Sequence, residues 1–249
     1  MIDMHCHILP GLDDGPKLLK ETVAMAKAAA EQGIDTIIAT PHHNNGKYIN
    51  ERQDILGAAD FVNAQIQQLG IPLDIVPGQE IHLYQDIVHD LEQGRLLPLN
   101  QATKYVLIEL PANHFPAETT RIVFDLQMAG YIPVIAHPEK NAIITNNPDI
   151  LYDLVKNGAL VQVDAASVIG VNGKKVKKRT QQMLNANMVH LMATNAHTAK
   201  TVRLTEAYEV LDPATSEQLQ ENSEWLLLDK PIAKDIPERI SKSRFRKFF

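Results

Sequence analysis

The sequence of 249 residues predicts an α/β fold in a single domain, a closed or nearly closed (β/α)7 barrel of TIM-like type. Short apolar runs rich in Ile, Val and Leu alternate along the chain with longer segments of helical character, and no linker or repeat interrupts them. Continuous apolar runs are typical of strands buried on both faces, and repeated strand–helix alternation implies right-handed crossovers and a parallel sheet. Seven such units suggest a closed or nearly closed barrel, with a doubly wound open sheet as the alternative.

The predicted elements follow in order along the chain. The expected strands span residues 2–7, 34–40, 73–78, 105–110, 132–137, 159–164 and 189–194. The expected helices span residues 18–32, 54–69, 118–129, 149–157 and 174–186. Gly33, Gly130 and Gly158 stand where three of these helices should end, a position that glycine favours.

The composition excludes several classes of protein. The net charge is −6, which argues against a general nucleic-acid binder, and a single cysteine excludes an internal disulfide or a multi-cysteine zinc site. No run of about 18 apolar residues is present, and the start of the chain lacks the basic and apolar regions of a signal peptide. We therefore expect a soluble cytoplasmic protein.

The last residues differ from the rest, so we divide the chain into a domain over 1–230 and a tail over 231–249. Basic residues alternate with phenylalanines in this tail: Arg239, Lys242, Arg244, Arg246 and Lys247 with Phe245, Phe248 and Phe249. Two interpretations stay open: a frayed, solvated terminus, or a patch that docks on an acidic partner or an anionic membrane surface.

Side chains that can bind metal ions stand at the ends of the predicted strands or in the loops that follow them. They are His5 and His7 in H-x-H, Asp13 and Asp14 in PGLDDG, His42 and His43 in TPHHNNG, Glu80 in PGQE, Glu109 in LIEL, His137 in IAHPEK, and Asn195 and His197 in ATNAH. In a parallel barrel these positions share the carboxyl-end rim, where barrel active sites are built. We therefore expect them to converge.

The types of residue predict a metal cluster. Imidazole and carboxylate together suit Mn, Fe, Co or Zn, and a carboxylate such as Glu80 can bridge two ions that clamp a phosphoryl group. Cys6 should point to the face opposite its two neighbouring histidines, so we leave it out of the ligand set. The other histidines show no such placement and are expected to be surface or packing residues: His82, His89, His114 and His190.

Other hydrolytic and nucleotide-binding signatures are missing. The sequence has no G-x-S-x-G, no Walker A motif and no dinucleotide fingerprint. A cysteine-dependent phosphatase would need an arginine at short spacing after its cysteine, and the HILPGL that follows Cys6 contains none.

The motifs in combination resemble a known family. MIDMHCHILPGLDDG, IIATPHHNNGKY, PGQEI, LIELP, GYIPVIAHPEK and NAH are similar to the manganese-dependent protein-tyrosine phosphatases of Gram-positive capsule and exopolysaccharide loci. These belong to the PHP (polymerase and histidinol phosphatase) superfamily. The resemblance runs from Met1 to about residue 200 and is weaker beyond.

The resemblance implies a distorted barrel that holds three ions, Mn²⁺ first among the candidates. It matches His5, His7, Glu80 and Asn195 to the first ion, Glu80, Glu109 and His137 to the second, and Asp14, His42 and His197 to the third. It also implies hydrolysis of phosphotyrosine on the tail of a membrane-associated tyrosine kinase that controls capsule or exopolysaccharide synthesis.

The chain departs from the family pattern at two positions. Asn195 stands where the family has an aspartate, so the first ion loses a negative charge. Lys140 replaces an arginine and loses the bidentate fork that matches phosphate oxygens. Both changes would weaken the same reaction.

We expect in-line attack by a metal-bound hydroxide, with Lys140, Asp14 and His42 as the candidate catalytic residues and Lys140 as an added positive contact to the phosphate. Two alternatives remain: a small-molecule phosphoesterase of histidinol-phosphatase type, and a degenerate homologue that binds phosphotyrosine without turnover because of Asn195 and Lys140. An oligomer is also possible.

Overall fold

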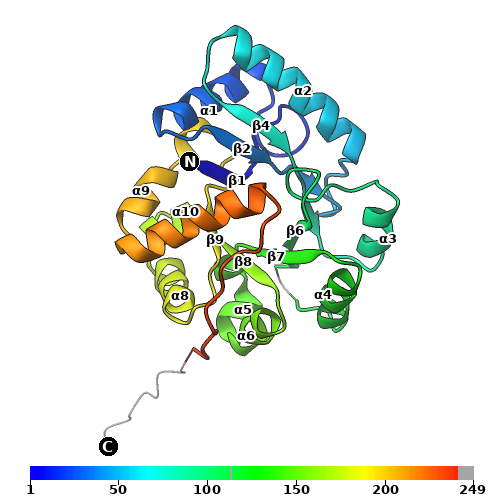
Figure 1. Ribbon diagram of the computed structural model, residues 1–249, viewed down its shortest axis with the longest axis vertical. Helices are drawn as coiled ribbons and strands as arrows, with labels where there is room; N and C mark the ends of the chain where they lie inside the picture. Colours follow the sequence, from blue (N-terminus) through cyan, green and yellow to red (C-terminus); the bar gives the residue numbers. More distant parts are fainter. Residues whose placement is uncertain (113, 241–249) are drawn as a thin grey trace, which may run out of the picture.

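The computed structural model describes residues 1–112 and 114–240, which fold into an α/β structure with parallel strands in two sheets (Figure 1). The first sheet has the order β1-β2-β4, and the second has the order β3-β5-β6-β7-β8-β9. The strands are β1 Ile2–Cys6, β2 Thr36–Ala39, β3 His42–His43, β4 Asp74–Pro77, β5 Glu80–His82, β6 Tyr105–Glu109, β7 Ile132–Ala136, β8 Leu160–Asp164 and β9 Leu191–Ala193. This order follows the chain, unlike that of a doubly wound sheet, in which the order reverses.

Helices follow most of the strands and cover the sheets from outside. The α-helices are α1 Leu19–Glu31, α2 Arg52–Gln68, α3 Ile87–Glu92, α4 Thr119–Met128, α5 Ala142–Asn146, α6 Asp149–Lys156, α7 Ala165–Ile169, α8 Lys174–Asn185, α9 Leu204–Glu209 and α10 Pro213–Leu227. Two 3₁₀ helices are η1 Pro138–Lys140 and η2 Ala199–Thr201. None of the helices in the described part of the chain has the length and apolar character that a membrane span requires.

Backbone hydrogen bonds join the two sheets at both junctions. The N–H of Gly78 donates to the carbonyl of Ala39 (2.9 Å) and that of Glu80 to Pro41 (3.2 Å), so the β2–β4 pairing continues into β3–β5. On the other side Cys6 forms a parallel bridge with Ala196, just after β9. The first and last strands therefore lie side by side.

The seven predicted strands are confirmed in position, and two short strands that were not predicted follow two of them. Predicted strand 34–40 becomes β2, followed after Pro41 by the short β3, and predicted strand 73–78 becomes β4, followed after Gly78 by β5. Pro41 has no backbone N–H to donate, and a Cβ on Gly78 would lie 2.7 Å from Ile38. These bends turn the strand ends that carry His42 and Glu80.

Two apolar clusters separate the inside of the strand array from the helical layer. The inner cluster takes one face of the strands and includes Met4, Ile38, Leu107, Leu160 and Leu191. The outer cluster packs the other face against the helices. Alternation along each strand produces this division, since successive side chains point to opposite faces.

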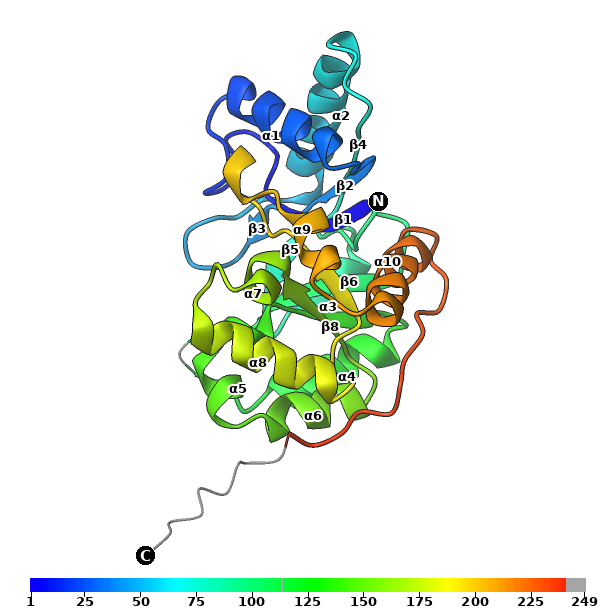
Figure 2. The ribbon, with the colours of Figure 1, turned by 90° about the vertical axis from the view of Figure 1, so that its left-hand side faces the viewer.

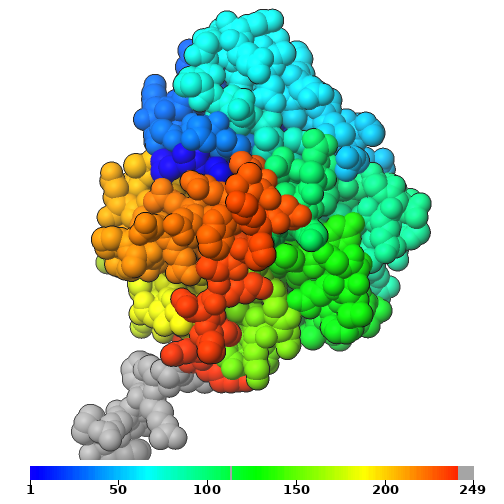
Figure 3. Space-filling model, viewed as in Figure 1, coloured from blue at the N-terminus to red at the C-terminus, as the bar shows by residue number. Residues whose placement is uncertain are grey.

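Helix α10, which the periodicity analysis did not predict, covers the amino ends of the strands. Leu226 of α10 and Ile232 beyond it are buried in the inner cluster. In Figures 1 and 3 α10 and the segment after it, in orange and red, lie across one face of the molecule. The inner cluster is thereby closed at that end.

The described part of the predicted tail, residues 231–240, packs against the domain. Arg239 forms ion pairs with Asp149 (2.6 Å) and Asp153 (3.2 Å) of α6 and lies 4.2 Å from the ring centroid of Tyr152. Residues 241–249, with most of the predicted basic-aromatic patch, lie outside the described residues.

His190, predicted as a surface or packing residue, packs in the core and should make stability depend on pH. Its side chain is buried, its Nδ1 accepts a hydrogen bond from the N–H of Val161 (3.1 Å), and burial and the charge of Lys234 lower its pKa to about 4. The unfolded chain binds this proton near pH 6.5 and the folded chain near pH 4, so stability is lost as the pH falls between these values.

We predict that His190→Gln reduces this acid-dependent loss by up to about 3 kcal/mol, measured as the free energy of urea unfolding between pH 7 and pH 4. His89 is exposed, so His89→Gln is the control: it removes a surface histidine and leaves the buried His190 in place. An unchanged pH dependence in His190→Gln would contradict the assignment.

Candidate metal centre

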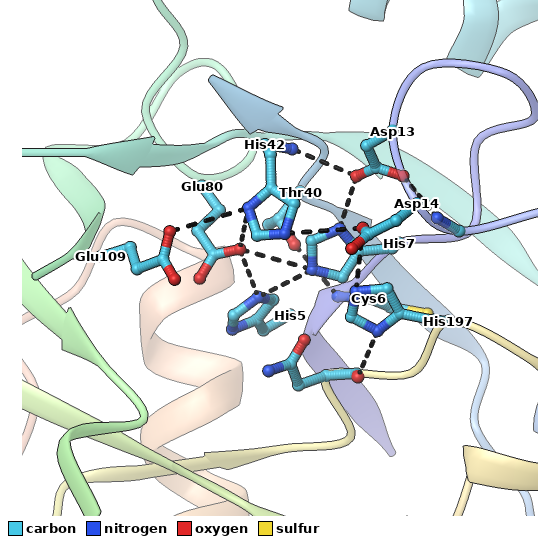
Figure 4. A network of polar contacts seen from close by, with 12 residues as sticks. His5, Cys6, His7, Asp13, Asp14, Thr40, His42, Glu80, Glu109 and His197 are labelled. Carbon is cyan, nitrogen blue, oxygen red and sulfur yellow. Dashed lines mark hydrogen bonds and ion pairs between the residues drawn. The ribbon is translucent and has the colours of Figure 1, made fainter. Parts of the chain in front are cut away.

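The predicted metal-binding side chains converge at the carboxyl ends of the strands, on the side of the molecule away from α10. Figure 4 shows Glu80 next to His5, His7 and His42, with Asp14 and His197 beside them. Three groups of donor atoms lie within 4.8 Å of one another: His5, His7 and Glu80; His42, Glu80 and Glu109; and His7, Asp14, His42 and His197. The predicted convergence of the strand ends is thus present in the structure.

Glu80, at the start of β5, is the centre of this cluster. Its side chain is fully buried, and its Oε2 lies 2.8 Å from Nδ1 of His42 and 3.4 Å from Nε2 of both His5 and His7. Its Oε1 lies 2.8 Å from Nε2 of His137. Although Oε2 and Nδ1 of His42 are close, their orientation makes no hydrogen bond, and both atoms are buried without one.

Hydrogen bonds on the far side of each ring orient three of the histidines. Nδ1 of His5 lies 3.0 Å from Oε1 of Gln162, and Nδ1 of His7 lies 2.5 Å from Oδ2 of Asp13. Nδ1 of His197 lies 3.0 Å from the carbonyl oxygen of Asn195. When Nδ1 donates to oxygen, Nε2 keeps its lone pair, and this lone pair is what a metal ion needs.

The third group lies at the more exposed side of the cluster. Oδ1 of Asp14 lies 3.3 Å from Nε2 of His197 and 3.6 Å from Nε2 of His42. The rings of His7 and His197 stack with centroids 4.0 Å apart. The loop after β1 brings Asp14 here because Asp13 accepts hydrogen bonds from the backbone N–H groups of Gly15 (2.9 Å) and His42 (3.1 Å).

His82 belongs to the edge of this centre, although the sequence analysis treated it as a surface or packing residue. Its Nδ1 lies 3.3 Å from Oε2 of Glu109, which in turn lies 3.9 Å from Nδ1 of His42. His43, predicted among the candidates, turns away and its Nδ1 contacts the carbonyl oxygen of Asn50 at 2.7 Å. His89 and His114 are exposed, as expected.

A second buried carboxylate, Asp164 at the end of β8, was missed in the sequence analysis. Its Oδ2 lies 2.7 Å from Nζ of Lys140 and accepts a hydrogen bond from the Asn195 side-chain amide at 3.3 Å. The amide oxygen of Asn195 is buried without a hydrogen bond. The ammonium group of Lys140 is thus held by Asp164 at the edge of the centre. The side-chain oxygen of Asn195, its only side-chain atom that could coordinate a cation, has no hydrogen bond.

Backbone strain accompanies this side of the centre. His137 has φ 35° and Asn195 has φ 49°, both in the left-handed region that residues other than glycine rarely adopt. Such outliers persist where the surrounding structure holds them, and they cluster at functional sites. Both residues come directly after or close to the end of a strand, where a sharp change of direction turns the side chain toward the centre.

The electrostatics favour ionised carboxylates in the centre. Burial opposes ionisation of Glu80, but the nearby imidazoles of His5, His137 and His42, with the hydrogen bond to His137, hold its pKa well below the usual value. Asp13 is also buried, yet its contacts with His7 lower its pKa to about 2. Negative charge is therefore available at the centre at neutral pH.

The pKa values of His7 and Cys6 are both raised, with different consequences for the centre. Burial disfavours protonation of His7, but Asp13 and Glu80 outweigh it and raise its pKa to about 10, so a metal ion and a proton would compete for this ring. Burial raises the pKa of the Cys6 thiol well above the usual value, and its Sγ contacts the carbonyl oxygen of Ala196 (3.6 Å). Cys6 is thus outside the centre, as predicted.

The donor set fits divalent cations. Imidazole nitrogens and carboxylate oxygens from separate strands point at shared positions, and each of three rings is oriented by an oxygen behind it. Glu80 contributes to two of the groups, which is the arrangement that a bridging carboxylate requires.

Comparison with known proteins agrees with this centre. Residues 1–230 match the family model described as capsular polysaccharide synthesis, CpsB/CapC. The chain is 44% identical to the tyrosine-protein phosphatase YwqE of Bacillus subtilis, over 100% of both chains, and 34% identical to the putative tyrosine-protein phosphatase CapC of Staphylococcus aureus, over 98% of both. It superposes with a TM-score of 0.94, at 44% identity and over 97% of this chain and 100% of the other, on a structure from a study of YwqE of Bacillus subtilis and CpsB of Streptococcus pneumoniae, described as unique metal-dependent tyrosine phosphatases.

The loop after β1 depends on Gly15, and we predict that Gly15→Ala weakens metal binding. A Cβ at this position would overlap the carbonyl oxygen of His7 and lie 3.1 Å from Oδ1 of Asp13, so the loop would have to move away from β1. We expect the affinity for Mn²⁺, measured by isothermal titration calorimetry, to fall at least about tenfold.

Gly57→Ala is the matched control, because Gly57 lies within α2 and a Cβ there would meet nothing within 4 Å. It should bind Mn²⁺ as the unchanged chain does and be slightly more stable. Equal affinity of Gly15→Ala and Gly57→Ala would show that the position of Asp13 and Asp14 is not critical.

Proposed function

This chain belongs to the capsular polysaccharide synthesis CpsB/CapC family, and from that membership we propose that it is a metal-dependent protein-tyrosine phosphatase. The observation that supports it most directly is the buried Glu80, surrounded by four histidines from three other segments. The proposed substrate is phosphotyrosine on a tyrosine kinase that controls capsule or exopolysaccharide synthesis, and the proposed location is the cytoplasm.

We propose that the cation is Mn²⁺, held in three positions. His5, His7 and Asn195 would hold the first ion, His137 and Glu109 the second, with Glu80 shared between them, and the third would take the group of Asp14, His42 and His197. The ions would act as Lewis acids, activating water and neutralising the phosphate oxygens.

The residues of the chain itself orient the phosphate and argue against a mechanism with a cysteine nucleophile. Lys140 presents a positive charge at the edge of the metal centre, where its ion pair with Asp164 fixes the position of the ammonium group. The buried, protonated Cys6 offers no thiolate nucleophile. Because a phenol has a pKa of about 10, its phenolate leaves with less help from an acid than an alkoxide does, which favours aryl over alkyl phosphates.

Our proposal also covers the barrel and the bounds of the domain. We propose that the two hydrogen-bonded sheets form one distorted seven-stranded barrel of the PHP type, and that the phosphatase domain covers residues 1–230. The junction bonds at Gly78, Glu80 and Ala196 support this proposal.

Metal dependence and substrate preference are tested together. We predict that the protein purified with Mn²⁺ hydrolyses a phosphotyrosine peptide at least about tenfold faster than the same peptide with phosphoserine, loses activity with EDTA and regains it with Mn²⁺. Released phosphate is the measurement. Cys6→Ala is the control and should keep the activity; equal rates on both peptides, or activity that survives chelation, would refute the assignment.

Asn195 distinguishes an active enzyme from a phosphotyrosine-binding homologue that does not turn over. Asn195→Asp adds a carboxylate beside Asp164, replacing an amide that donates to it. For an active enzyme we expect tighter metal binding and a change in kcat of less than about tenfold. Metal content by mass spectrometry and kcat on the peptide measure this, with Asn195→Ala as the control that lacks any side-chain oxygen; a gain in kcat of several hundredfold would favour the degenerate homologue.

A further inference from the structure

Three lysines lie around the exposed side of the metal centre, although the chain as a whole has a net charge of −6. Lys17 lies in the loop after β1, Lys47 in the loop after β3, and Lys200 in η2; we call these three residues the lysine rim. The loops after β1 and β3 project from the same side of the molecule (Figure 2). This is the side that carries Asp14, His42 and His197.

Tyr48 holds two of these lysines close to the centre. Its ring is parallel to that of His42, with an interplanar angle of 6° and centroids 6.4 Å apart. Nζ of Lys47 lies 4.8 Å from the centroid of Tyr48 and Nζ of Lys17 lies 6.0 Å from it. Cation–π attraction therefore gathers two ammonium groups next to a residue of the centre.

A pocket of about 520 Å³ opens beside the same residues, between α1 and η2. Asp14 and His197 form one wall, and Met25 lies in its lining with two alanines. Lys17 and Lys200 also line it. A side chain that enters this pocket would lie next to the metal centre and meet two ammonium groups as well as the carboxylates of Asp14 and Glu21.

The lysine rim is available to an outside anion. Among the ion pairs between described residues, none involves Lys17, Lys47 or Lys200, so none of the three lies within 4.0 Å of a carboxylate oxygen of a described residue. Glu21, which also lines the pocket, uses its Oε2 to accept the backbone N–H groups of Lys17 (2.7 Å) and Leu18 (3.1 Å). Lys17 donates from Nζ to the carbonyl oxygen of Asp13, which is a neutral partner.

We propose that the lysine rim binds acidic side chains next to the phosphotyrosine, so that the preferred substrate is an acidic phosphotyrosine peptide. This inference rests on the proposed phosphatase function. Neighbouring residues of an extended peptide are about 3.3–3.6 Å apart along the chain, so residues on either side of a phosphotyrosine at the centre reach the rim. Tyr48 acts as a positioning residue for Lys17 and Lys47.

The test uses the holoenzyme with Mn²⁺ and two phosphotyrosine peptides that differ only in flanking Glu and Asp against Gln and Asn. We expect kcat/KM at low salt to be about fivefold higher for the acidic peptide, mainly through KM, and the difference to shrink at 0.5 M NaCl. Lys47→Gln and Lys200→Gln should each reduce this preference. Hydrolysis of p-nitrophenyl phosphate, which has no flanking residues, should be unchanged in both.

Two substitutions of Tyr48 form a matched pair of variants. Tyr48→Phe keeps the ring and should keep the preference for the acidic peptide, whereas Tyr48→Ala should lose it. The same comparison is made by fluorescence anisotropy with peptides that carry a non-hydrolysable phosphonate in place of the phosphate, so binding is measured without turnover.

The outcomes separate the two proposals. Hydrolysis of both peptides at equal kcat/KM and equal binding of their phosphonates would overturn the acidic preference while the phosphatase function stands. A loss in the lysine variants that is equal for both peptides and for p-nitrophenyl phosphate would also overturn it, because the lysines would then serve the phosphate itself. Preferential binding of the acidic phosphonate with no turnover of any substrate would support the rim and refute the phosphatase function.

Discussion

The arrangement of the centre depends on one buried carboxylate. Glu80 has no exposed surface, and a charge removed from water in this way is costly unless opposite charges or hydrogen-bond donors surround it. Four imidazole rings from other segments surround it at 2.8–3.4 Å. The pairing of β3 with β5 and of β5 with β6 is therefore tied to the chemistry, because these strands carry the carboxylate and its partners to one place.

The apolar part of the molecule and its polar centre occupy different ends of the strand array. The inner cluster and α10 fill the amino-end half, while charged and imidazole side chains occupy the carboxyl-end half. A polar group near the amino end would disturb packing, and an apolar group at the carboxyl end would remove a side chain that can bind a metal ion. This division lets loops such as the one that carries Lys47 and Tyr48 vary in charge without a change in the core.

Much of the fold and the centre could be predicted from the sequence, since buried parallel strands leave continuous apolar runs and side chains that can bind metal ions stand at their ends. The kinks after Ala39 and Pro77 could not, because they depend on which backbone groups pair across the array. His82 carries a signal that was not used: it lies two residues after Glu80, so both share one face of β5, by the same logic that selected H-x-H. Helix α10 buries few large apolar side chains, and its position at the amino ends depends on the whole array.

The role of Asp164 does not follow from the sequence pattern alone. A carboxylate at the end of an apolar strand was expected to matter at Glu109, and the same argument applies to VQVD at β8. Its role depends on distances to Lys140 and Asn195, which come from segments far apart in the chain. Such contacts follow from tertiary structure and leave no local pattern.

The stacked rings of His7 and His197 come from opposite ends of the chain, 190 residues apart, and meet only where β1 lies beside the segment after β9. During synthesis on the ribosome, the amino-terminal residues of this centre are made first, and His197 is added later. A nascent or truncated chain that stops before this segment can hold an incomplete cluster at most. The group formed by His7, Asp14, His42 and His197 is thus complete only in a chain that includes the segment after β9.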